Sequence, residues 1–108
     1  MTSEDLIDRF TAITGPVPGF VAAFAEAVIL HATRRGVPQD IADRAVRQLF
    51  LSAGTTLSLD DKTPSAHVQE MIDYAGTTAA GLTTLRQGPL TEAVDAALEA
   101  AYQRTKTI

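Results

Sequence analysis

One segment of this sequence is apolar on nearly every side, and it limits what the chain can fold into. Within residues 20–32 the only strongly polar side chains are those of Glu26 and His31. A helix of that composition has no solvated face, and a chain of 108 residues cannot easily bury a helix on every side by itself. Either the segment is the central helix of a bundle, or a second chain covers part of it. We favour the second explanation.

The helical segment that follows, residues 39–59, also needs a partner to cover its apolar surface, in its second half. Its first half is amphipathic, whereas residues 49–59 carry no charged side chain. Small side chains at residues 52–56 let another helix approach closely. Gly54 in a helix interior costs about 1 kcal/mol relative to alanine, which close packing can compensate. A long surface without charge usually marks an interface, so we expect a dimer.

Glycine and proline residues occur at intervals along the rest of the sequence, and their positions predict where its helices begin and end. No stretch shows the alternation of apolar and polar residues that is typical of a strand. The sequence therefore predicts an all-α fold, a six-helix bundle in one domain spanning residues 1–108. The expected helices are residues 3–12, a long helix that begins near residues 16–19 and ends at Arg35, and residues 39–59, 64–74, 77–86 and 90–106.

Composition and charge argue against several kinds of partner. A net charge of −4 disfavours nucleic acid or an anionic membrane, because both require a basic face. The chain has no cysteine, and only His31 and His67 could offer imidazole, so we expect no metal site. We see no signal peptide and no run of about twenty apolar residues that could span a bilayer. We therefore expect a cytoplasmic protein without a membrane partner.

Residues 76–82 read Gly-Thr-Thr-Ala-Ala-Gly-Leu, which is typical of a loop turning into a helix N-terminus. The unpaired amide groups and the helix dipole at such a place favour anions. On the residues alone, an ordinary capped helix is the simpler interpretation. His31 is best explained as a packed or interface histidine, and Glu26 as a charge that is paired or faces water rather than a buried acid with a shifted pKa. We assign no role to His67.

Several motifs in their order along the chain carry a resemblance to a known family. Residues 14–20 are similar to a glycine-rich segment before a long helix, Glu26-Ala27 to an acid–alanine pair, and residues 36–38 to a glycine–leucine–proline turn. Gln48 and residues 100–106 also match, and residues 76–82 are the most specific match. Together these motifs resemble the C-terminal dimerisation domain of pyrroline-5-carboxylate reductase, of the 6-phosphogluconate dehydrogenase C-terminal-like superfamily. The resemblance covers residues 4–108.

The resemblance implies an interleaved, domain-swapped helical homodimer that can assemble further into rings. In that family a Rossmann domain supplies NAD(P)H, and hydride passes to an imine in the last step of proline synthesis. The imine substrate's carboxylate is held at the start of a glycine–threonine–threonine helix. That start corresponds here to Gly76, Thr77 and Thr78 as substrate-binding residues, with Thr78 nearest the substrate as the catalytic candidate.

Two departures from the family pattern bear on activity. No Gly-x-Gly-x-x-Gly loop and no parallel strands precede this domain, so we expect no cofactor-binding residue in the chain and no activity by the chain alone. The family's serine–proline–glycine–glycine loop reads Asp73-Tyr74-Ala75-Gly76 here. If Asp73 points inward and is ionised, at roughly 5 Å it opposes a bound carboxylate by about 3 kcal/mol.

Three functions follow as hypotheses. The first is the dimerisation and substrate-side domain of a pyrroline-5-carboxylate reductase-like oxidoreductase, built on a dimer of the helices at residues 19–35 and 39–59. The second is a non-catalytic oligomerisation or small carboxylate-binding module that uses residues 76–78. The third is a helical partner that docks a separately encoded Rossmann protein and restores activity in trans. The sequence alone leaves open whether the chain is a whole protein or part of one.

Overall fold

Helices account for most of residues 2–107, the part of the chain that the computed structural model describes, and no strand occurs there. The all-α prediction is therefore confirmed, and each helix end lies within two residues of its predicted position. Only Gly15 and Pro16 separate the first two helices, so counting these two as one interrupted helix gives five rather than six. The helices are α1 (Ser3–Thr14), α2 (Val17–Arg34), α3 (Gln39–Leu59), α4 (Pro64–Tyr74), α5 (Thr77–Gln87) and α6 (Leu90–Thr105).

The end of α2 shows how local chemistry fixes these boundaries. Gly36 has a φ of +97°, a backbone conformation that glycine adopts without steric cost. The Gly36 amide donates to the carbonyl of Thr33, and the Val37 amide donates to the carbonyl of Ala32. These two bonds form a Schellman motif, which satisfies carbonyls that the helix itself leaves unpaired. The predicted stop at Gly36 is confirmed.

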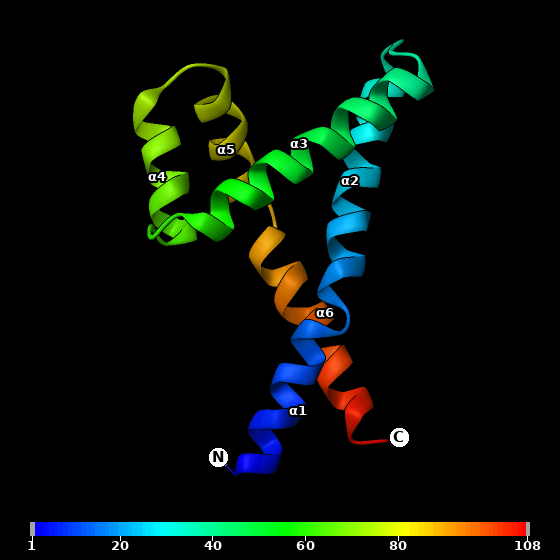
Figure 1. Ribbon diagram of the computed structural model, residues 1–108, viewed down its shortest axis with the longest axis vertical. Coiled ribbons are helices and arrows are strands. Elements are labelled where there is room, and N and C mark those ends of the chain that lie inside the picture. The colour runs from blue at the N-terminus through cyan, green and yellow to red at the C-terminus, as the bar shows by residue number, and fades with distance from the viewer. Residues whose placement is uncertain (1, 108) are drawn as a thin grey trace. The chain divides into compact units, whose positions relative to one another are not determined.

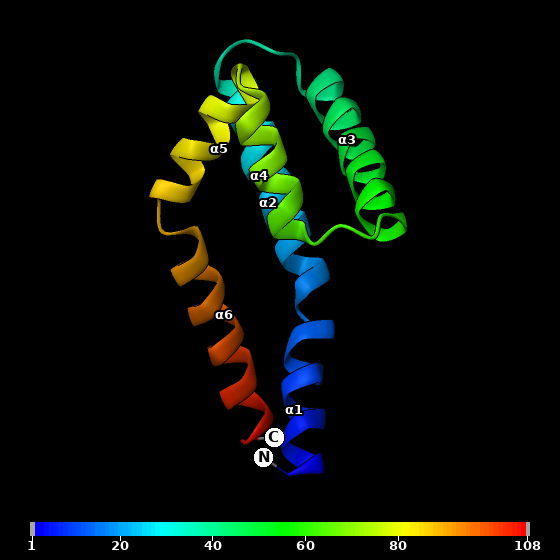
Figure 2. The same cartoon turned by 90° about the vertical axis from the view of Figure 1, so that its left-hand side faces the viewer.

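The chain divides into two compact units. One unit is Val17–Asp61, the hairpin of α2 and α3, in which the rings of Phe24 and Phe50 lie 5.7 Å apart between centroids. The other unit combines the chain up to Pro16 with the chain from Lys62 onward. In this second unit α1 packs against α6, α4 packs against α5, and α5 touches α6 (Figures 1 and 2).

Neither unit encloses a substantial apolar core. Among the described residues only Ala12, Ala42, Val46 and Tyr102 are buried hydrophobic side chains, and α2 contains no buried residue. Residues 51–59 of α3 are exposed throughout. The most apolar helices, α2 and the second half of α3, therefore keep their side chains largely exposed in the single chain.

The sequence has no run of about twenty apolar residues, but one shorter stretch meets a criterion of length and mean hydropathy for crossing a membrane. An 18-residue window within Ser3–Arg34 reaches a mean hydropathy of 1.7, which meets that criterion by length and composition alone. The stretch is interrupted by the turn at Gly15 and Pro16, and none of the window is buried in the single chain. A helix covered by protein partners has the same composition, so this finding carries no assignment by itself.

Candidate functional site

The turn between α4 and α5 has an unusual backbone. Ala75 has a φ of +71° and Gly76 a φ of +89°, so two consecutive residues lie in the region that favours glycine. A positive φ costs glycine little, whereas a side chain at such a position adds strain. The turn thus ends α4 and begins α5 within two residues, at the place where the sequence predicts a loop turning into a helix.

The start of α5 lacks the side-chain cap that α1 and α4 have. Thr2 and Thr63 cap α1 and α4 by accepting a hydrogen bond from a backbone amide, each at 3.1 Å. At α5 the capping position is Gly76, and no side chain makes a capping bond there. The first hydrogen bond of this helix runs from the Ala80 amide to the Gly76 carbonyl. The backbone amides before Ala80 therefore have no carbonyl partner within the helix.

A cavity of about 500 Å³ opens beside this helix start. The predicted residues Gly76, Thr77 and Thr78 all line it, so the structure brings them to one place. The rest of the lining comes from the turn and from one face of α4, whose residues are spaced three or four apart. The additional lining residues are His67, Glu70, Met71, Tyr74 and Ala75. Their roles, like those of the three predicted residues, stay predictions.

Sequence reasoning missed most of these α4 residues, although one signal was present. Met71, for example, is 49% exposed and borders the cavity. The spacing of His67, Glu70, Met71 and Tyr74 marks a single helix face that leads directly into the turn at residue 75.

The concern over Asp73 is corrected by its position. Asp73 does not line the cavity; its carboxylate accepts a hydrogen bond from the Gln69 side chain at 2.9 Å. The acid that does line the cavity is Glu70, whose carboxylate lies 2.7 Å from the ammonium group of Lys62. The negative charge that faces the cavity is therefore that of Glu70 rather than Asp73, and Lys62 partly offsets it.

A second hollow, of about 410 Å³, lies between α2 and α3 within their hairpin. Glu26 lines it and is exposed, which agrees with the interpretation that this acid faces water in the single chain. Across the hollow, Arg47 and Asp43 form an ion pair at 2.8 Å within α3. His31 is exposed and does not line either hollow.

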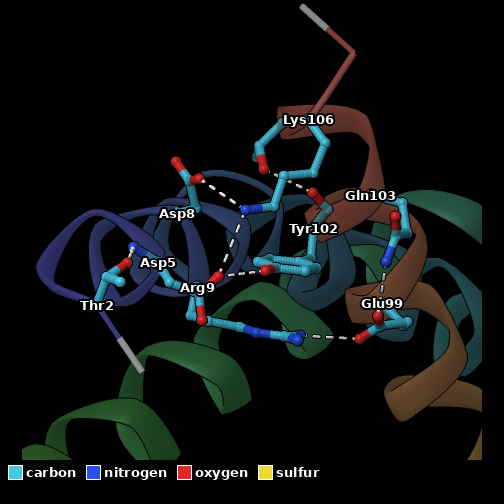
Figure 3. Close-up of polar contacts among 9 residues, drawn as sticks. Thr2, Asp5, Asp8, Arg9, Glu99, Tyr102, Gln103 and Lys106 are labelled. Carbon is cyan, nitrogen blue, oxygen red and sulfur yellow. Dashed lines mark hydrogen bonds and ion pairs between the residues drawn. The ribbon is translucent and has the colours of Figure 1, made fainter.

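The most extensive polar network joins α1 to α6 (Figure 3). Tyr102 is 8% exposed and donates a hydrogen bond to Asp5. The guanidinium carbon of Arg9 lies 3.3 Å from the centre of its ring, and the ammonium nitrogen of Lys106 lies 4.8 Å away. Arg9 is also paired with Glu99 at 2.9 Å.

These contacts shift the pKa values of the charged groups. The pKa of Asp5 lies below its ordinary value because Tyr102 and then Lys106 stabilise the carboxylate. The pKa of Glu99 is lowered by hydrogen bonds from Gln103 and Arg9. The pKa values of Arg9 and Lys106 are raised, chiefly by Glu99 in the first case and by Tyr102 and Asp8 in the second.

Comparison with known proteins was made on both sequence and structure. The sequence model described as pyrroline-5-carboxylate reductase dimerisation matches residues 4–108. Pyrroline-5-carboxylate reductase 3 of Rattus norvegicus is 34% identical over 105 residues, which are 97% of this chain and 38% of that protein. Pyrroline-5-carboxylate reductase of Synechocystis is 28% identical over 97% of this chain and 39% of its own length.

Two solved structures of such reductases share the fold. The enzyme from Coxiella burnetii superposes with a TM-score of 0.87 at 26% identity, over 99% of this chain and 40% of that chain. The crystal structure from Plasmodium falciparum, which has NADP bound, gives a TM-score of 0.85 at 25% identity, over 99% and 42%. The present chain thus spans about two fifths of the length of the relatives it matches.

Proposed function

We infer the function of this chain from one premise: it belongs to the pyrroline-5-carboxylate reductase dimerisation family. We propose that it forms the dimerisation and substrate-side part of an NAD(P)H-dependent imine reductase. Because the chain covers only about two fifths of its reductase relatives, the activity belongs to the larger assembly in this proposal.

The observation that carries the proposal is the uncovered apolar surface of the α2–α3 hairpin. Of the large hydrophobic side chains that are exposed, nine lie on this hairpin or its connecting loop, including Phe24, Leu51 and Leu57. A second copy that packs on this surface would remove those side chains from water at about 25 cal/mol per Å² of apolar area. We propose an interleaved homodimer in which α2 and α3 of the two copies form the shared core.

The oligomeric state in solution tests this part of the proposal. The chain has a mass of 11.5 kDa, so sedimentation equilibrium should give twice that mass or a higher multiple at micromolar concentration. A stable, well-folded monomer at that concentration would rule out a dimer built on α2 and α3.

The second part of the proposal concerns the cavity at the start of α5. The first-turn amides and the helix dipole favour a carboxylate there, and Thr78 offers a hydroxyl beside it. Substrate orientation is then the contribution of this chain: the carboxylate is anchored so that the imine carbon faces the hydride donor. An enzyme that holds its substrate in this way gains rate through positioning.

The described part of the chain has neither a strand nor a glycine-rich loop after one, which are the elements of a Rossmann nucleotide site. NADP is bound in the Plasmodium falciparum relative. We propose that a cofactor domain, joined to this chain or acting in trans, supplies the nicotinamide. Its chemistry is hydride donation, and no residue of the present chain is assigned to that step.

Calorimetric titration with L-proline as a carboxylate analogue tests the substrate role. Thr78→Val should weaken binding about fivefold, through loss of one hydrogen bond. Thr83→Val, on the same helix but outside the cavity lining, is the matched control and should bind as the unaltered chain does. Absence of heat with any small carboxylate would leave dimerisation as the only role, and equal loss in both variants would remove Thr78 from the site.

The alternative function is a carboxylate-binding or oligomerisation module without catalysis. The departures at Tyr74 and Ala75, together with the acid Glu70 in the cavity lining, favour it. Mixing the chain with a Rossmann protein of the same family separates the two functions. NADPH-dependent imine reduction that appears only in the mixture supports the reductase role, whereas binding without reduction supports the module.

A further inference from the structure

We propose that the contact between α1 and α6 is an electrostatic latch, which docks α6 at low ionic strength and releases it when salt screens its charges. The latch is independent of the carboxylate site and of the apolar hairpin surface. Its residues lie in the first two turns of α1, in the last two turns of α6 and at the C-cap position that follows α6. They are Asp5, Asp8, Arg9, Glu99, Tyr102 and Lys106.

Tyr102 is the centre of the latch. Its hydroxyl donates to Asp5 on the other helix, and its ring lies between the cations of Arg9 and Lys106 (Figure 3). Each cation then reaches across to an acid of the opposite helix. Arg9 pairs with Glu99 at 2.9 Å, while Lys106 lies 3.2 Å from Asp8 and 3.4 Å from Asp5. All of these contacts except that of Lys106 with the Tyr102 ring join α1 to the C-terminal end of α6.

Apolar burial contributes little to the same contact. The only buried side chains on the two helices are Ala12 and Tyr102. The large apolar residues of α1 stay 45–64% exposed, including Ile13, which borders a small hollow against Leu98 of α6. They are Leu6, Ile7, Phe10 and Ile13. Docking of α6 therefore depends on charge and on the cation–ring contacts more than on the hydrophobic effect.

The charged members are accessible to ions from the solvent. The side chains of Arg9, Glu99 and Lys106 are 43%, 49% and 42% exposed. Exposed ion pairs weaken steeply with salt, because the screening length falls from about 30 Å at 0.01 M to about 3 Å at 1 M. The hairpin offers a contrast, since α2 and α3 meet through Phe24 and Phe50 rather than through an ion pair between the helices.

The connections of α6 allow it to leave α1 without breaking a helix. The latch residues on the two helices are about 90 to 100 positions apart, and their loss leaves the local cap of α1 by Thr2 intact. At its other end α6 joins α5 through Gly88 and Pro89. These two residues are the natural place for the change in backbone direction when the latch opens.

Amide hydrogen exchange on the full chain, at about 0.01 M and about 1 M sodium chloride, tests the latch. Exchange in the last two turns of α6 should become about tenfold faster at high salt, while exchange in the hairpin stays constant or slows. Unchanged exchange in α6, or an equal acceleration in every helix, would overturn the proposal.

Two variants distinguish the latch from a general effect of surface charge. Arg9→Gln removes the cation on the Tyr102 ring and its pairing with Glu99, so α6 should exchange roughly fivefold faster at low salt and respond less to added salt. Arg47→Gln, which breaks an ion pair of similar length inside α3, is the matched control and should leave α6 unaffected. Identical behaviour of the two variants would show that no latch exists.

Discussion

At the scale of single residues, the turn before α5 holds the only non-glycine residue with a positive φ in the described part of the chain. Ala75 has a φ of +71° and a ψ of −173°, a conformation that nearly all non-glycine residues avoid. The resemblance places a glycine at this position in the family. Alanine at position 75 therefore holds this turn at the expense of backbone strain.

Ala75→Gly should raise the free energy of unfolding by about 1 kcal/mol. Glycine removes the backbone strain of the folded turn, and this gain exceeds the cost of the larger conformational entropy that glycine gives the unfolded chain. The measurement is thermal or urea unfolding at one fixed protein concentration, since association also stabilises the chain.

Gly76→Ala is the reciprocal control and should lower the free energy of unfolding by roughly 1 kcal/mol or more. A Cβ built at Gly76 meets nothing within 4 Å, so this substitution reports backbone strain rather than a steric clash. If Ala75→Gly were destabilising, the turn would have to be held by contacts other than its backbone preference.

At the scale of helices, the pairing of α1 with α6 has a defined pH range. Asp5 and Glu99 have lowered pKa values in the folded chain, so their stabilisation is present above their ordinary values of 3.8 and 4.5. It is lost as the pH falls through the lower folded values. The pKa of Lys106 is raised, so its contribution is present below its ordinary value of 10.5 and is lost only at higher pH.

Tyr102→Phe should raise the pKa of Asp5 toward 3.8, because the tyrosine hydroxyl is the largest cause of the lowering. Titration of the side-chain carboxyl carbons by NMR measures this directly. The pKa of Glu99 serves as the internal control, since the hydrogen bonds from Gln103 and Arg9 persist in the variant. An unchanged pKa for Asp5 would mean that the hydroxyl does not stabilise its carboxylate in solution.

At the scale of the whole molecule, the chain is built to associate. Its buried set consists of a few small side chains and one tyrosine, while the α2–α3 hairpin exposes Leu51, Leu57 and other large apolar residues. In an isolated chain with so little apolar burial, the hydrophobic stabilisation barely exceeds the conformational entropy that is lost on folding. In the dimer we propose, association through the hairpin would supply the missing apolar burial.

Leu51→Asp should weaken the proposed dimer about a hundredfold, since an unpaired carboxylate in an apolar interface costs about 3 kcal/mol. Leu51 is 64% exposed in the single chain, so the substitution removes no contact within it that is needed for folding. Sedimentation over a concentration series gives the dissociation constant.

Arg44→Gln on the charged first half of α3 is the control and should associate like the unaltered chain. Association that is insensitive to Leu51→Asp would exclude the second half of α3 from the interface.

The sequence by itself determined the helices and their ends, because glycine, proline and capping threonines act on their immediate neighbours. It also located the start of α5 and the charge-free half of α3, since both depend on residues adjacent in the chain. The tertiary structure decided what distant residues do. It placed Glu70 rather than Asp73 at the cavity and gathered Tyr102 with Asp5 and Arg9. Those outcomes depend on the rotation of one helix against another, which helical periodicity alone leaves undetermined.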